Sequence, residues 1–224
     1  HGDDDQGDDD HGDDDHAHGD DAHVDDDHGD DDHAHGDDDG HDDHAHGDED
    51  PHFWHDATRM AVAVEAIADA LSEVEGIDAA ALDARAAELA DEYRALDAEI
   101  AEIVAVVAEE DRELLTNHDS LGYFADRHGF DVIGVVFTGG STLSEPSAAD
   151  IAELVEEIEI HGLRAIFAET TVGTDLAETL AAEVGRDVAV VTLFTGSLGP
   201  EGSGAETYPD MMRTNAELIA AALG

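Results

Sequence analysis

Two short segments carry histidines among residues that could bind a metal ion. Segment 50–56, Asp-Pro-His-Phe-Trp-His-Asp, holds His52, His55 and the only Trp of the chain. Segment 116–124, Thr-Asn-His-Asp-Ser-Leu-Gly-Tyr-Phe, places His118 directly after a predicted strand. Because open α/β sheets bind ligands beyond the carboxyl ends of their strands, His118 lies where a ligand would bind. On spacing alone, an ordinary helix-capping or buried polar role for His118 stays equally open.

Residues 1–50 form a low-complexity tract with 11 His, 25 acidic residues and no basic residue. The tract has almost no apolar residue to bury, so we expect it to be disordered without a ligand. His-x-His pairs offer two imidazoles to one zinc ion, which favours a weak, multi-site zinc collector over a merely solvated acidic loop. The paired histidines are His16, His18, His33, His35, His44 and His46.

The composition excludes several classes of partner and site. The chain has 8 basic residues, all of them Arg, against 60 acidic ones, which gives a formal net charge of -52. Nucleic acids and anionic membrane surfaces would repel such a polyanion, so neither is an expected partner. The absence of Cys excludes thiolate sites and disulfides. An acidic surplus of this size destabilises a compact fold by self-repulsion unless salt screens it. Because the Debye length falls to about 3 Å in molar salt, this composition indicates a halophilic source.

Two helices are predicted after the tract, over 57–75 and 78–111. The apolar residues of the second recur at alternating intervals of four and three, which is the signature of one apolar stripe on an α-helix. A helix of about 32 residues is roughly 48 Å long, and this length predicts a connection between two bodies. No run of about 20 apolar residues occurs, so no membrane-spanning segment is predicted.

After residue 111, short apolar strands alternate with helices. This order predicts a parallel sheet with both faces covered, and therefore an α/β lobe over 112–224. Ser147 and Asp150 have the spacing of a capping box. The predicted strands are 114–116, 131–136, 165–168 and 188–193, and the predicted helices are 119–128, 147–161, 174–184 and 206–223.

Four motifs, in order, resemble one family, the ZnuA-like (cluster A-I) metal-binding proteins of ABC importers. Residues 51–54 are similar to its Pro-His-x-Trp motif and 118–124 to its His-Asp-x-x-Gly-Tyr-Phe motif; 167–169 and 206–215 also match. The resemblance implies a two-lobed α/β fold with a long connecting helix and the metal between the lobes. It also implies zinc, because a His/Asp-rich loop before the first motif marks the zinc members.

On this resemblance, His52 and His118 are metal ligands, and a further His belongs to an N-terminal lobe that we expect this sequence to lack. Manganese members often have an Asp where this chain has Gly196, so the expected site is dominated by nitrogen and suits zinc. The implied domains are the tract (1–50), the end of the N-terminal lobe (51–77), the interlobe helix (78–111) and the C-terminal lobe (112–224).

Three other polar residues have more than one interpretation. His55 follows His52 by three residues, and a surface or packing role is favoured over metal ligation. Asp119 could orient His118 as a hydrogen-bond partner or cap the following helix. Glu169 ends a strand on the same side as His118 and is not counted among the ligands.

The leading hypothesis is an extracytoplasmic solute-binding protein, not an enzyme, that captures Zn²⁺ and delivers it to an ABC importer. Its partners would be the permease and ATPase subunits, and an N-terminal lipid anchor outside this sequence would hold it at the cell surface. The alternative is a zinc-buffering or storage protein that acts through the His/Asp-rich tract. A metallohydrolase would need a general base, for which Asp119 or Glu169 could serve, and a substrate pocket, which nothing in the sequence indicates.

Overall fold

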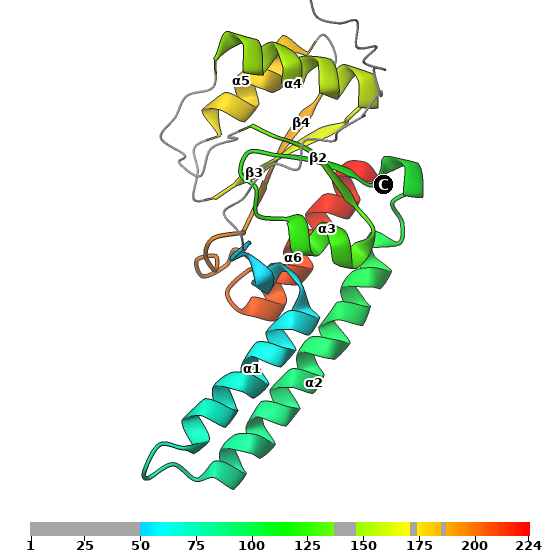
Figure 1. The fold of residues 1–224 in the computed structure, drawn as a ribbon. Coiled ribbons are helices and arrows are strands. Elements are labelled where there is room, and N and C mark those ends of the chain that lie inside the picture. The colour runs from blue at the N-terminus through cyan, green and yellow to red at the C-terminus, as the bar shows by residue number, and fades with distance from the viewer. Residues whose placement is uncertain (1–49, 137–146, 171–173, 185–186) are drawn as a thin grey trace, which may run out of the picture. The chain divides into compact units, whose positions relative to one another are not determined.

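The computed structural model describes residues 50–136, 147–170, 174–184 and 187–224. Their centre is a parallel sheet of four strands in the order β2-β1-β3-β4 (Figure 1). The strands are β1 (Glu113–Thr116), β2 (Asp131–Val135), β3 (Ala165–Glu169) and β4 (Ala189–Leu193). Parallel neighbours need crossover connections, which helices supply here. The predicted α/β class with a parallel sheet is confirmed.

β3 lies inside the sheet, and all five of its residues are buried. A continuous apolar run is typical of a strand that is covered on both faces. The pairing of β1 with β2 is irregular between Leu114 and Leu115. A Cβ on Gly134 of β2 would lie 2.7 Å from Leu115 Cδ1, so glycine leaves room there for the Leu115 side chain.

Four helices connect or follow the strands: α3 (Gly122–His128), α4 (Ala148–His161), α5 (Asp175–Glu183) and α6 (Tyr208–Leu223). The capping box predicted at Ser147 and Asp150 is present at the start of α4. α3 begins at Gly122 rather than at residue 119, so the first part of that predicted helix is wrong. The residues before Gly122 form a loop at the carboxyl end of β1, and this loop contains His118.

Two further helices, α1 (Ala57–Ser72) and α2 (Ala79–Val104), lie side by side as an antiparallel pair (Figure 1). α2 has 26 residues, so it is about 39 Å long and shorter than predicted. The chain turns after α2, where the Val107 N–H bonds to the Val104 carbonyl at 3.0 Å, and Val107 is buried in the core at 1% exposure. A short 3₁₀ helix, η2 (Glu109–Asp111), then leads into β1.

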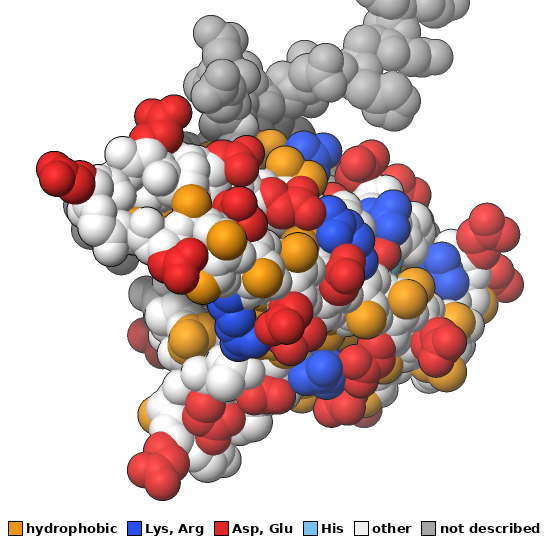
Figure 2. All heavy atoms as spheres, turned by 90° about the horizontal axis from the view of Figure 1, so that it is seen from below, with side chains coloured by type: hydrophobic (Ala, Val, Ile, Leu, Met, Phe, Trp, Pro, Cys, Tyr) orange, Lys and Arg blue, Asp and Glu red, His pale blue; other side chains and the backbone are white. Residues whose placement is uncertain are grey.

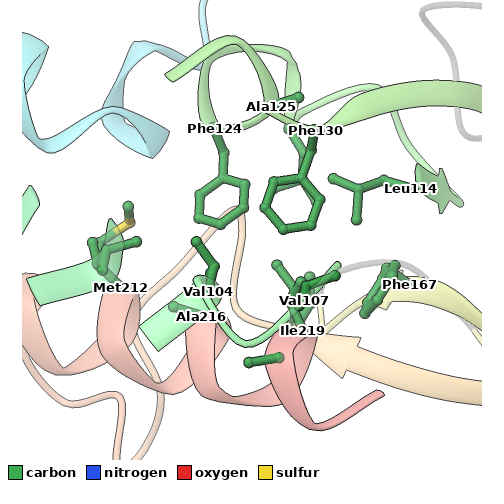
Figure 3. Close-up of a cluster of buried hydrophobic side chains, with 14 of the residues drawn as sticks. Val104, Val107, Leu114, Phe124, Ala125, Phe130, Phe167, Met212, Ala216 and Ile219 are labelled. Carbon is green, nitrogen blue, oxygen red and sulfur yellow. The ribbon is translucent and has the colours of Figure 1, made fainter. Parts of the chain in front are cut away.

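Two buried clusters cover the two faces of the sheet. β3 contributes Phe167 to one cluster and Ile166 to the other, as the two-residue period of a strand requires. The first cluster joins α2, α3 and α6, and Figure 3 shows Phe124, Phe130 and Ile219 packed within it. The second cluster joins α4 and α5 to the opposite face. The sheet therefore has helices on both faces, as predicted.

One ion pair, between a buried carboxylate and an exposed guanidinium, ties α2 to α3. Asp97 lies on the buried face of α2 with 7% exposure, and the Arg127 guanidinium donates to both of its carboxylate oxygens at 2.7 and 2.5 Å. Because a bidentate partner neutralises the buried carboxylate, a charge is tolerated in an otherwise apolar stripe. None of the described helices has the length and apolar composition needed to cross a membrane.

Candidate metal site

The imidazoles of His52 and His118 come together although 66 residues separate them in the chain. His118 lies in the loop after β1, and His52 directly precedes the 3₁₀ helix η1 (Phe53–His55). Their Nε2 atoms are 3.3 Å apart, and the ring planes are inclined at 84°. Two residues that were singled out in separate motifs thus face each other.

The separation of the two Nε2 atoms fits one metal ion bound by both. Zinc binds imidazole nitrogen at about 2.05 Å with tetrahedral angles, so two ligating nitrogens should be about 3.3 Å apart. The observed 3.3 Å equals this value. The two rings need little rearrangement to bind zinc, and rigid placement of this kind favours chelation.

Asp50 fixes the orientation of the His52 ring. Its Oδ1 atom lies 2.7 Å from His52 Nδ1 and also accepts the His52 backbone N–H at 2.9 Å. A carboxylate at Nδ1 favours the tautomer with the proton on that nitrogen, because the carboxylate can only accept. The lone pair of His52 Nε2 is then directed toward His118.

The Gly-Tyr-Phe part of the second motif holds Asp50 in place. The Tyr123 hydroxyl donates to the Asp50 backbone carbonyl at 3.1 Å. A Cβ on Gly122 would lie 3.4 Å from Asp50 Oδ2, so glycine leaves room for the carboxylate. The Arg59 guanidinium covers the Tyr123 ring at 4.4 Å from its centroid. Sequence reasoning missed this role, although Asp50 and Gly122 both lie in the quoted segments.

Trp54 connects the His52 segment to the loop after β4. Its Nε1–H donates to the Thr195 carbonyl at 2.8 Å, and its ring lies edge-on to His52 at 5.3 Å. Asn215 of α6 holds the same loop, since its amide oxygen accepts from Phe194 N at 2.9 Å and its Nδ2 donates to Phe194 O at 2.7 Å. Trp54 and Asn215 thus position the site without providing ligands.

His55 is buried at 1% exposure. Of the surface and packing roles that were predicted for it, the burial agrees with packing, and the surface role is wrong. Its Nε2 atom has no hydrogen-bond partner among the described residues. Burial, followed by the nearby His52, lowers the pKa of His55 to about 4. Asp56 caps α1 as predicted, because its carboxylate accepts from the N–H groups of Thr58 and Arg59.

The other two polar candidates lie beside His118. Asp119 does not occupy the N-cap position of α3, because that helix begins three residues later and Leu121 stands there. Glu169 is buried at 5% exposure and accepts a hydrogen bond from Ser120 Oγ at 2.7 Å. Gly196 is exposed. It is the position at which this chain was expected to lack the Asp of the manganese members.

In the described part of the chain, no group of three or more His, Cys, Asp or Glu side chains is arranged to hold a metal ion. His52 and His118 are thus a pair of candidate ligands that face each other. His16, His18, His33, His35, His44 and His46 lie outside the described residues.

Comparison with known proteins gives consistent matches. The model of the ZnuA family, zinc-uptake complex component A, periplasmic, matches residues 4–222. The zinc-binding protein TroA of Treponema pallidum is 33% identical over 181 residues, or 76% of this chain and 56% of TroA. The manganese-binding lipoprotein MntA of Halalkalibacterium halodurans is 32% identical over 170 residues, again 76% of this chain and 56% of MntA.

Solved structures give the same result. The periplasmic zinc-binding protein TroA from Treponema pallidum superposes with a TM-score of 0.71 at 32% identity, covering 78% of this chain and 64% of that one. A crystal structure of ZnuA gives a TM-score of 0.67 at 25% identity, covering 78% and 60%. The chain thus spans a little over half the length of the curated relatives MntA and TroA.

Proposed function

Because the chain belongs to the ZnuA family, we propose that it is a solute-binding protein that captures zinc outside the cytoplasm and delivers it to an ABC importer. The observation that carries the proposal is the 3.3 Å separation of the Nε2 atoms of His52 and His118. Two neutral imidazoles at this distance can chelate one divalent ion, and release of an unchanged ion requires no catalytic step. We propose no catalysed reaction.

Zinc is the proposed cargo, although the relatives include both a zinc-binding and a manganese-binding protein. Both ligands offered here are imidazole nitrogens, and Gly196 offers no side-chain oxygen. Manganese favours more oxygen ligands, whereas zinc accepts nitrogen ligands in a tetrahedral arrangement. We propose that a further His, outside this sequence, completes the site.

The proposed partners are the permease and ATPase subunits of the importer. A curated relative, MntA, is a lipoprotein, and we propose a comparable lipid anchor that would hold this protein at the cell surface. The net charge of -52 opposes direct binding to an anionic membrane surface, so the anchor would be the membrane attachment.

A local reporter tests the proposal. Trp54 is the only Trp of the chain and lies 5.3 Å from His52, so Co²⁺ bound at His52 and His118 should quench its fluorescence. Zn²⁺ should displace Co²⁺ and restore the emission, whereas Mn²⁺ should do so only at much higher concentration. In cells, disruption of the gene should slow uptake of radioactive zinc at limiting zinc. Quenching that Mn²⁺ reverses more readily than Zn²⁺ would contradict zinc as the cargo.

The second candidate function is zinc storage by the tract, and the 11 His within residues 1–50 favour it. Stoichiometry separates the two functions, since capture needs one tight site and storage needs several equivalent weak ones. Deletion of residues 1–49 should remove several weak sites and leave the Trp54 response unchanged. If a peptide of these residues binds no more zinc than a poly-Asp control, the storage function is wrong.

A further inference from the structure

The loop that carries His118 is bonded to one residue of β3 on both sides of the histidine. Before His118, the Asn117 side-chain oxygen accepts the Glu169 backbone N–H at 3.1 Å. After it, Ser120 Oγ donates to Glu169 Oε1 at 2.7 Å. Glu169 ends β3, and Asn117 directly follows β1, so neighbouring strands bring the three residues together.

Burial divides this loop into residues that anchor it and a residue that is presented. Asn117 and Ser120 are each 1% exposed, and Glu169 is 5% exposed, whereas His118 is only partly buried. Inside a protein these hydrogen bonds do not compete with water, and a carboxylate is a strong acceptor. The Ser120 N–H also bonds to the His118 carbonyl at 3.0 Å, which closes a tight turn.

We propose that Glu169 is a positioning residue for His118: by holding Ser120, its carboxylate keeps the His118 ring at chelating distance from His52. The inference rests on the proposed function and adds a specific role for the third sequence motif. His52 is fixed by Asp50, but His118 must also be held, because a two-nitrogen site loses affinity when either ring is free to turn. Glu169 supplies that constraint without touching the metal.

Three variants of the 224-residue chain separate positioning from simple stability. Ser120→Ala removes the donor and retains every atom of Glu169. Glu169→Ala removes the acceptor. Glu169→Gln removes the charge but keeps an oxygen that can accept from Ser120. Glu153→Gln is the control, because Glu153 is exposed on α4 and its substitution removes the same charge elsewhere.

The readout is the zinc affinity measured through Co²⁺ quenching of Trp54 and its reversal by Zn²⁺, beside the Tm of the metal-free protein. We expect Ser120→Ala and Glu169→Ala to weaken binding by about 10- to 100-fold, as loss of a ligand-orienting partner does. Glu169→Gln should recover most of the affinity, and Glu153→Gln should bind like the wild type.

Several outcomes would overturn the inference. If Ser120→Ala and Glu169→Ala lower the Tm but keep wild-type affinity, Glu169 is a stabilising residue only. If Glu169→Gln binds as weakly as Glu169→Ala, the charge and not the bond to Ser120 matters. If Glu169→Ala does not fold, the zinc affinity of Ser120→Ala tests the inference, and wild-type affinity in that variant would overturn it. If the wild type itself gives no Trp54 response, both the proposed function and this inference fail. If the wild type responds and only the expected differences between the variants are missing, the inference alone fails.

Discussion

Tyr208, the first residue of α6, donates its hydroxyl to the backbone carbonyl of Trp54 at 2.8 Å, across 154 residues of chain. The Tyr208 ring also packs against Tyr93 of α2 with the ring centroids 4.9 Å apart. The C-terminal helix therefore fixes η1, which directly follows His52. The tail motif and the Pro-His-x-Trp motif meet in one contact, so the tail motif contributes to the geometry of the proposed zinc site.

The first prediction concerns the two proposed ligands. His52→Ala and His118→Ala should each weaken Trp54-reported zinc binding at least about 100-fold, because one remaining imidazole provides no chelate. His161→Ala is the matched control, since His161 lies on α4 and bonds to Glu113 at 2.9 Å. Titration with Co²⁺ and back-titration with Zn²⁺ give the affinities. Tight binding that survives His118→Ala would place the site elsewhere.

The second prediction concerns Asp50. Asp50→Ala should weaken zinc binding by about 10- to 100-fold, because the His52 ring loses the acceptor that fixes its tautomer and orientation. Asp126→Ala, which removes an exposed carboxylate from α3, should have no such effect. The same fluorescence titration measures both variants. Equal affinities for Asp50→Ala and Asp126→Ala would show that Asp50 does not position His52.

Much of the fold was predictable because the local signals agree with the packing. Apolar runs at the four strands and the Ser147–Asp150 capping box each depend on a few neighbouring residues. The length of α2 was overestimated because here the local signal does not agree with the packing. The apolar stripe continues to Val107, but Val107 is used after a turn to fill the core and does not extend α2. Periodicity alone cannot distinguish these two uses of one residue.

The site was predictable in its ligand candidates and not in its supporting contacts. His52 and His118 lie in recognisable motifs, but the hydrogen bonds of Asp50 with Tyr123 and of Trp54 with Thr195 join residues far apart in sequence. Such pairs depend on how the sheet and helices pack, which no local pattern specifies. The environment of His55 is partly of the same kind, because the backbone of Thr195, in the loop after β4, is among its hydrogen-bond partners.

The third prediction is that the folded state depends on salt. The net charge is -52, and Figure 2 shows acidic side chains spread over the visible face, with basic and hydrophobic side chains between them. Repulsion among these carboxylates is unscreened at low ionic strength and is largely removed when the Debye length falls to about 3 Å at 1 M. Cooperative thermal unfolding should be lost in dilute buffer and return in molar KCl. A Tm that is constant from 0.1 to 3 M KCl would contradict both this prediction and the expectation of a halophilic source.

The last prediction concerns stability and pH. Burial lowers the pKa of His55 from 6.5 to about 4, so the unfolded chain binds a proton in a pH range where the folded chain does not. The stability associated with neutral His55 is therefore fully present above pH 6.5 and is lost as the pH falls toward 4. By linkage, this single group should lower the free energy of unfolding by about 2 kcal/mol between pH 7.5 and pH 5.

His55→Leu isolates this contribution from the many carboxylates and from His128, whose pKa is also lowered by burial. Urea unfolding of metal-free protein in molar KCl, at pH 7.5 and pH 5, gives the free energy of unfolding for both chains. The variant should lose about 2 kcal/mol less than the wild type between the two pH values, because leucine takes up no proton in the unfolded state. A parallel loss in both proteins would mean that His55 titrates near its ordinary pKa in the folded chain, and that the burial of its ring does not govern its charge.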